Sequence, residues 1–178
     1  TDEDGVSQIA INSSKELLAT GHFRNTIDFN SDAADGKLTS AGNTDIYVAK
    51  FGVNGEYMFA KGFGSINYDF GISLVLDTDE NIYVGGSIDN TVDFNPDAEG
   101  GEVSETNSDA FIAKFAPDGN YIFAKSTGGY INSLALSGNR LLASGKFYKT
   151  EDFDPSDAVQ SLTPASGNGS GFIAKYST

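Results

Sequence analysis

The chain alternates between short apolar runs and short polar turns, and no segment keeps the 3.6-residue period of an amphipathic helix. The apolar runs are rich in β-branched and aromatic residues and are separated by Gly, Asn, Asp and Ser. This pattern is typical of β-strands joined by tight turns. The sequence therefore predicts an all-β protein.

The same order of apolar runs returns three times, and each repeat begins with two runs joined by a polar turn. These paired runs lie at 8–11 and 17–21, at 73–76 and 82–86, and at 133–136 and 141–145. A second pair follows at 47–51 and 57–61, and at 111–115 and 121–125. Asn54-Gly55 and Asp118-Gly119 join the second pairs, and both dipeptides favour tight hairpins. We expect four antiparallel strands in each repeat.

Four antiparallel strands per repeat is the plan of a β-propeller blade. The third repeat reaches 172–176 without a counterpart of 57–61, so eleven strands are expected and the last blade lacks its outer strand. We interpret 1–178 as one repeat domain with blades at about 1–65, 66–129 and 130–178. Alternating positions predict a core, which includes Ile46, Val48, Leu74, Leu76, Ile112, Leu134, Leu136 and Ile173.

Closed propellers contain four to eight blades, so three blades pose a question of closure. One interpretation is a fragment of a longer propeller. A second is a homodimer that joins two chains into a six-bladed ring. A third is an open array in which each unit contacts only its neighbours. Membership of a larger assembly is the alternative to a homodimer.

The net charge of −14 argues against a nucleic-acid partner, because phosphate binding needs a basic surface. No apolar run approaches the length of a membrane-spanning helix, so membrane insertion is not expected. The chain has no cysteine, which excludes disulfides and thiolate metal sites. A leader peptide is not visible, and one removed by processing would leave no trace.

Three motifs of the second repeat resemble those of the bacterial β-propeller repeat family. They are DFNP at 93–96, DAFIAKF at 109–115 and DGNYIFAK at 118–125. The likeness extends over residues 6–176. Such repeats occur in large secreted or surface-attached bacterial proteins, so the resemblance implies an extracellular or cell-surface location and no inherited enzymology.

The Asp-Phe motif opens an acidic stretch in every repeat. Oxygen side chains alternate there in the manner of a calcium loop, at Asp28, Asn30 and Asp32, at Asp93, Asn95 and Asp97, and at Asp152, Asp154 and Asp157. No repeat completes an EF-hand. The second interpretation is an Asx turn, in which the first Asp caps backbone N–H groups while the Phe enters the core.

Other candidate residues favour structural roles. Five lysines follow an alanine in the repeated motif: Lys50, Lys61, Lys114, Lys125 and Lys175. We expect them to pair with carboxylates and to protect strand edges. A ring of cations that binds an acidic ligand is the less favoured interpretation. The single histidine, His22, has no partners for a triad or a zinc site. Tyr68, Tyr130 and Tyr148 suit either stacking on sugars or packing between blades.

These observations favour a non-catalytic scaffold that binds a protein or a glycan, or that mediates assembly. A glycan hydrolase or lyase that uses loop carboxylates is an alternative, and it predicts two close carboxylates in a cleft with perturbed titration. A purely structural subunit of a larger surface complex is the other alternative, and it predicts a defined oligomer without a ligand.

Overall fold

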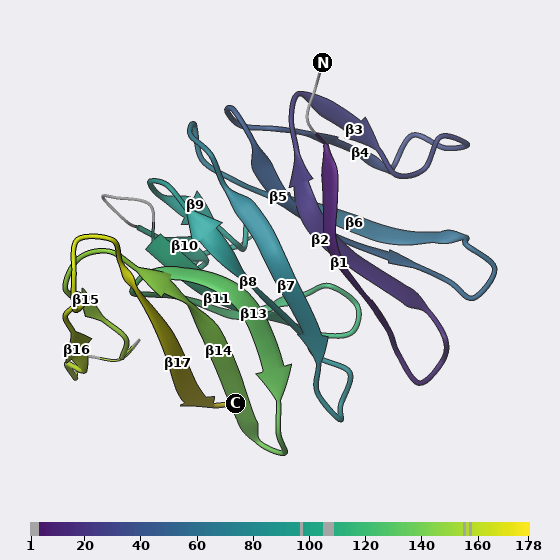
Figure 1. Ribbon diagram of the computed structural model, residues 1–178. Coiled ribbons are helices and arrows are strands. Elements are labelled where there is room, and N and C mark those ends of the chain that lie inside the picture. The colour runs from purple at the N-terminus through teal and green to yellow at the C-terminus, as the bar shows by residue number, and fades with distance from the viewer. Residues whose placement is uncertain (1–3, 97, 105–108, 155, 157) are drawn as a thin grey trace.

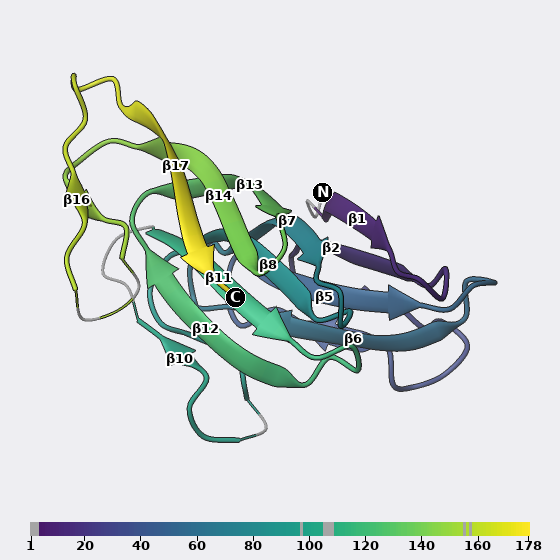
Figure 2. The same ribbon diagram turned by 90° about the horizontal axis from the view of Figure 1, so that it is seen from below.

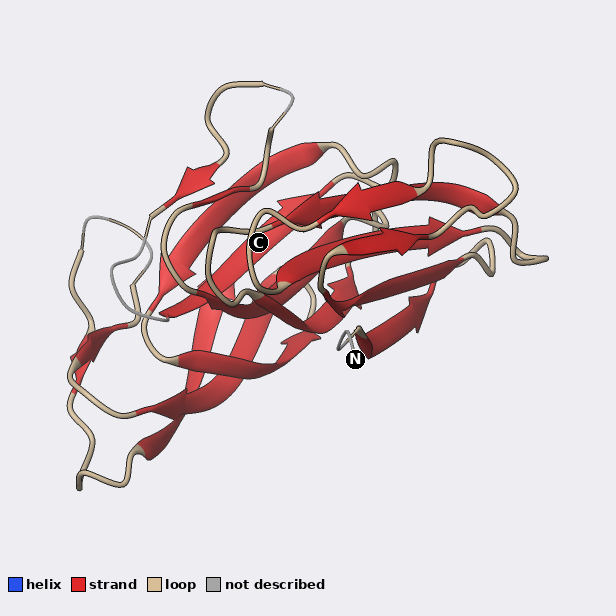
Figure 3. Cartoon of the chain, turned by 90° about the horizontal axis from the view of Figure 1, so that it is seen from above, coloured by secondary structure: helices blue, strands red, loops and turns tan. Residues whose placement is uncertain are grey.

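The computed structural model describes residues 4–96, 98–104, 109–154, 156 and 158–178. Every regular element in these residues is a β-strand, which confirms the all-β prediction (Figure 3). Within the same residues, no helix offers the length and apolar character needed to cross a membrane.

Three principal antiparallel sheets follow one another along the chain (Figure 1). The first unit consists of β1 (Gly5–Ile11), β2 (Leu17–Phe23), β5 (Asp45–Phe51) and β6 (Tyr57–Phe63). The second unit consists of β7 (Phe70–Leu76), β8 (Ile82–Ile88), β11 (Asp109–Phe115) and β12 (Tyr121–Thr127). The third unit consists of β13 (Tyr130–Leu136), β14 (Arg140–Phe147) and β17 (Ser170–Ser177). These eleven described strands match the predicted hairpins, and each unit has the strand order of a propeller-like blade.

Six further short strands were not expected from the sequence. They form one small hairpin between the second and third strands of each unit: β3 (Thr26–Asp28) with β4 (Lys37–Thr39), β9 (Val92–Asp93) with β10 (Glu102–Val103), and β15 (Glu151–Asp152) with β16 (Ser161–Leu162). The Asp of each Asp-Phe motif therefore ends a strand, and the Phe follows it. Runs of two or three paired residues are too short to leave a period in the sequence.

A β-bulge lies near the start of the first strand of each unit, next to the hydrogen bonds that join the units. The register shifts before Gln8 in β1, before Ser73 in β7 and before Ser133 in β13. Gln8 Oε1 accepts hydrogen bonds from the Ser73 hydroxyl (2.7 Å) and from the N–H of Leu74 (3.1 Å). Ser73 Oγ in turn accepts the N–H of Leu134 (2.9 Å). Each unit thus supplies an acceptor to the next one, and β7 lies between β1 and β13.

Apolar side chains fill the space between consecutive units. We call the face turned to the following unit the rear face and the face turned to the preceding unit the front face. Val48, on the rear face of the first unit, shares a buried cluster with Leu74 of the second unit. Ile112, on the rear face of the second unit, shares another with Ile131 and Leu134 of the third.

The predicted core is largely confirmed. Five of its members are fully buried, and Leu76 and Leu136 are half-buried against the same clusters. The prediction for Ile173 is wrong, because its side chain is 82% exposed. Val48 and Ile112 occupy the same place in their units, and each is covered by the unit that follows it. Ile173 has the right pattern but lies on a rear face that no described residue covers.

Candidate functional site

The loops that follow the Asp-Phe motifs share one geometry. We call residues 28–36, 93–101 and 152–160 the DF loops. The Oδ1 atom of the leading aspartate accepts the N–H two residues later, at 3.0 Å for Asp28, 2.8 Å for Asp93 and 3.0 Å for Asp152. The Phe N–H bonds the carbonyl seven residues later in every loop. These contacts are those of the Asx-turn interpretation.

The phenylalanines of the DF loops anchor the loops to their sheets. Phe94 is 1% exposed and Phe153 is 6% exposed. Phe29 is half-buried and packs at 4.9 Å, between ring centroids, against Tyr47. The apolar ring therefore enters the core as expected, and the polar residues on either side of it remain at the surface.

Calcium binding by the DF loops stays a prediction. Asp97 and Asp157 lie outside the described residues. Among the residues that the structure does describe, no group of three or more His, Cys, Asp or Glu side chains could hold a metal ion. The leading aspartates already accept backbone N–H groups, which leaves part of each carboxylate for a cation.

Tyrosines on the outer strands hold two of the DF loops in place. The Tyr57 hydroxyl donates to the carbonyl oxygen of Asp35 (3.0 Å) and accepts the N–H of Ala60 (3.0 Å). The Tyr121 hydroxyl makes the same two bonds, to Gly100 O and from Ala124 N, both at 3.0 Å. The outer strand therefore holds the DF loop in place through its tyrosine. The sequence did not predict this role, although both tyrosines recur in the repeated motif.

A second acidic site lies between the second and third units. Asp109, Glu151, Asp152 and Asp154 line a cavity of about 430 Å³ together with Lys125. Lys149 Nζ lies 3.9 Å from Asp109 Oδ1 and 3.5 Å from Glu151 Oε1. Two segments far apart in the sequence meet here, which is why the motifs did not reveal the site. Its carboxylates belong to ion pairs and turns.

Two buried aspartates, Asp45 and Asp69, lie between the first and second units and best match the carboxylate pair that a hydrolase would need. Burial raises the pKa of both Asp45 and Asp69, and the charge of Asp69 adds to the shift of Asp45. Their exposed fractions are 3% and 0%. Asp69 accepts the N–H groups of Ser65 (2.6 Å) and Asp89 (2.8 Å), and Asp45 accepts that of Ala41 (2.8 Å). These carboxylates order loops and offer no surface to a substrate.

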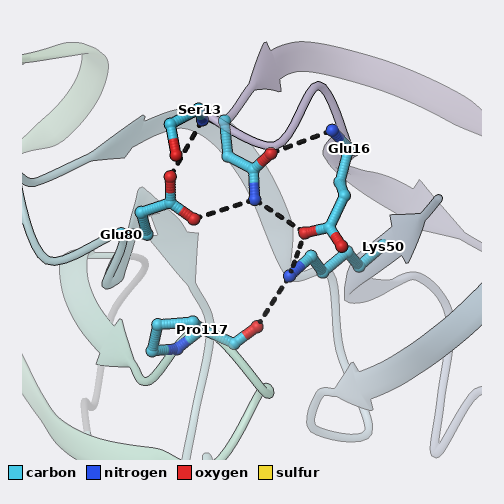
Figure 4. Close-up of polar contacts among 6 residues, drawn as sticks. Ser13, Glu16, Lys50, Glu80 and Pro117 are labelled. Atoms are coloured by element: carbon cyan, nitrogen blue, oxygen red, sulfur yellow. Dashed lines mark hydrogen bonds and ion pairs between the residues drawn. The ribbon is translucent and has the colours of Figure 1, made fainter. Parts of the chain in front are cut away.

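Lys50 is the centre of a polar cluster that joins the turns of the first two units (Figure 4). Its ammonium group lies 2.7 Å from Glu16 Oε2 and donates to the carbonyl oxygen of Pro117 (3.2 Å). Glu80 accepts the N–H of Ser13 (2.8 Å). The hydrogen bond from Lys50 is the main reason why the pKa of Glu16 lies below its usual value.

The predicted pairing of the repeated lysines with carboxylates is confirmed at two positions. Lys114 lies 3.3 Å from Asp77 Oδ2, and its ammonium group stands 4.7 Å from the ring centre of Tyr83. Edge protection is wrong for Lys50 and Lys114, because β5 and β11 are paired on both sides. Lys61 and Lys125 do lie on the outer strands β6 and β12.

The remaining candidates are His22 and three tyrosines. His22 meets the ring of Phe70 edge-on at 5.2 Å between centroids, so it packs between the first two units. Tyr130 and Tyr148 form a second edge-on pair at 6.1 Å, and both are exposed. Tyr68 is exposed as well. The tyrosine pair borders a small cavity with Asn132 and Lys146.

Comparison with known proteins adds no assignment, because no family model matches the chain and no curated protein matches it. The resemblance to the bacterial β-propeller repeat family therefore stays a prediction from the motifs.

Proposed function

We propose that the chain is a non-catalytic assembly and binding scaffold, exposed on the bacterial exterior, whose two terminal unit faces engage further units of the same kind. The observation that carries this proposal is a contrast in exposure at equivalent positions. Leu74 and Leu134, on the front faces of the second and third units, are 1% and 4% exposed, whereas Ile9 on the first front face is 57% exposed. Ile173 shows the same contrast on the last rear face.

The hydrogen bonds from Leu74 N to Gln8 and from Leu134 N to Ser73, which we call the hydrogen-bond relay, also support contact between an open rear face and an open front face. Gln8 and Ser73 each accept an N–H of the following unit, and Ser133 occupies the equivalent position on the open rear face. Ile9 occupies the position of Leu74 and Leu134 on the open front face. A second copy that stacked as the internal units do would bring Ser133 to the N–H of Ile9. Two copies joined at both faces would contain six units, within the range of closed propellers.

The apolar character of the open faces also favours docking. Val6, Ile9 and Ile11 are all more than half exposed on β1, and Leu142 lies half-buried near Ile173 on the opposite end. Burial of such side chains contributes about 25 cal/mol per Å² of apolar surface. The net charge of −14 opposes association, and we therefore expect salt to strengthen it.

Light scattering coupled to size-exclusion chromatography tests this proposal. We expect a dimer, or a mass that rises with protein concentration, and we expect Ile173→Asp to return the chain to a monomer. Ile122→Asp is the matched control, because Ile122 is 45% exposed on the outer strand β12 and lies on neither open face. A well-folded monomer at all concentrations would overturn self-assembly through these faces.

A glycan is the second candidate partner, and the exposed pair of Tyr130 and Tyr148 favours it. Aromatic rings beside amide and ammonium groups provide an apolar platform and donors for hydroxyls. Titration with oligosaccharides, monitored by tyrosine fluorescence, tests this candidate. Binding that survives Tyr148→Ala would exclude this pair as the site.

The hydrolase alternative has less support. Asp45 and Asp69 have the raised pKa values that this alternative predicts. A substrate cannot reach them, because both side chains are buried and bonded to backbone N–H groups. An enzyme needs the substrate within hydrogen-bond reach of its acid and base.

A further inference from the structure

The third unit offers an unpaired strand edge. In the other units the third strand is paired on both sides, by β2 and β6 around β5 and by β8 and β12 around β11. In the described residues, β17 pairs with β14 alone. A free edge presents a row of N–H and C=O groups that can pair with another extended segment. Figure 2 shows β17 at the margin of its sheet, with β16 set apart from it.

A groove lies along this edge. Its volume is about 570 Å³, and its lining includes Phe153, Leu162, Phe172, Ala174 and Tyr176. In the first and second units, the strands β4 and β10 of the small hairpins pack against the outer strands β6 and β12 in the corresponding place. The groove beside β16 is therefore the position that an outer strand occupies elsewhere in the molecule.

Exposure of the small hairpin follows the presence of that outer strand. Val103 of β10 is 7% exposed next to β12, whereas Leu162 in the equivalent position of β16 is 48% exposed. The volume, the apolar lining and the free edge all point to the same occupant. We propose that β17 and β16 bind an extended segment with the side-chain pattern of β6 and β12. The proposal deepens the scaffold function, but it uses a strand edge and not the unit faces.

The internal repeats specify the register of this segment. Ala60 pairs with Ala49 and Ala124 pairs with Ala113, so an alanine of the donated strand would lie opposite Ala174. A phenylalanine then lies opposite Lys175, as Phe59 and Phe123 lie opposite Lys50 and Lys114. The segment runs antiparallel to β17 and needs the length of β6 and β12, seven residues.

A tyrosine at the start of the segment supplies a further contact. Tyr57 and Tyr121 donate to the carbonyl oxygens of Asp35 and Gly100. These two residues directly precede Gly36 and Gly101, whose carbonyl oxygens accept the Phe N–H of the same DF loop. Phe153 N bonds the carbonyl of Gln160, so Val159 occupies this place in the third unit. The hydroxyl of the donated tyrosine would therefore bond the carbonyl oxygen of Val159. This contact selects the register, because a shift by one residue moves the tyrosine to the other face.

A labelled synthetic peptide with the sequence of residues 119–128 is the probe, and fluorescence anisotropy is the measurement. We expect saturable binding to the whole chain. A peptide of the same composition whose apolar alternation is displaced by one residue should bind at least about tenfold more weakly, because its side chains face the wrong way. No binding, or equal binding of both peptides, would overturn the proposal.

Protein variants separate this site from the unit faces. Leu162→Ser lies on an exposed position and should weaken peptide binding by about tenfold without loss of the fold, which circular dichroism checks. Ile9→Ser should leave peptide binding unchanged even where it abolishes assembly. Hydrogen exchange should show new protection within 170–177 when the peptide is present.

Discussion

The second and third units are built from the same motifs but differ in what surrounds them. The second unit has neighbours on both faces and an outer strand, and Phe111, Ile112 and Val103 are buried there. In the third unit Phe172 is still buried, but Ile173 and Leu162 are exposed. The motif therefore sets the direction of a side chain, whereas the next unit sets its burial. This is the behaviour of a linear repeat array.

The largest expected effect comes from truncating one position in both units. Ile112→Ala should destabilise the fold by about 2–5 kcal/mol, because it leaves a cavity between the second and third units. Ile173→Ala should change the stability of the monomer by less than about 0.5 kcal/mol, because its side chain is exposed there. Urea unfolding measures both variants. Equal costs would contradict the difference in burial on which the comparison is based.

A smaller effect is expected where the hydrogen-bond relay is cut. Ser73→Ala removes the acceptor of the buried Leu134 N–H and should cost about 1–3 kcal/mol. Ser133→Ala, at the exposed end of the same relay, should be nearly neutral in the monomer. Thermal unfolding at low protein concentration distinguishes them. A cost for Ser133→Ala that appears only at high concentration would locate Ser133 in a contact between copies.

The start of the third strand carries an aspartate in the first two units and Ser170 in the third. Burial raises the pKa of Asp45 in the folded state, so its contribution to stability is fully present below the unfolded pKa and is lost as pH rises through the folded pKa. Asp45→Asn should therefore raise Tm at pH 7, by about 2–4 °C if the gain is ~1 kcal/mol, and lose that gain near pH 3. Melting curves at both pH values measure this. A lower Tm at pH 7 would mean that the hydrogen bond to Ala41 requires the charged carboxylate.

The smallest expected effect concerns the DF loops. Asp93→Ala removes the acceptor of the Asn95 N–H and should cost about 1 kcal/mol, as loss of a cap does. That cost should not depend on calcium if the aspartate serves the turn alone, whereas a bound cation would stabilise the parent chain by mass action. Melting curves with calcium and with a chelator separate the two cases. Identical curves for the parent chain would exclude the calcium prediction.

Most of the fold was predictable because hairpin signals are local. Asn54-Gly55 and Asp118-Gly119 form the turns that their sequence favours, and Gly55 and Gly119 have φ angles of 87° and 83°. The small hairpins were missed because two or three paired residues leave no period. The acidic cavity at Asp109 and Asp152 was missed because those residues meet only after the units stack. The exposure of Ile173 depends on neighbours outside its own motif, which no local pattern encodes.

The relay of Gln8, Ser73 and Leu134 has a consequence for how such a protein can change over generations. The first and second units each carry an acceptor for the unit that follows, and the second and third units each carry the matching donor. Duplication or deletion of a whole unit would therefore keep such junctions chemically complete. Chain length can therefore vary in steps of one unit without new contacts having to arise. The same interchangeability exposes identical neighbours to mispairing during folding. Gln8 and Ser73 are different residues, so the two internal junctions have different acceptors.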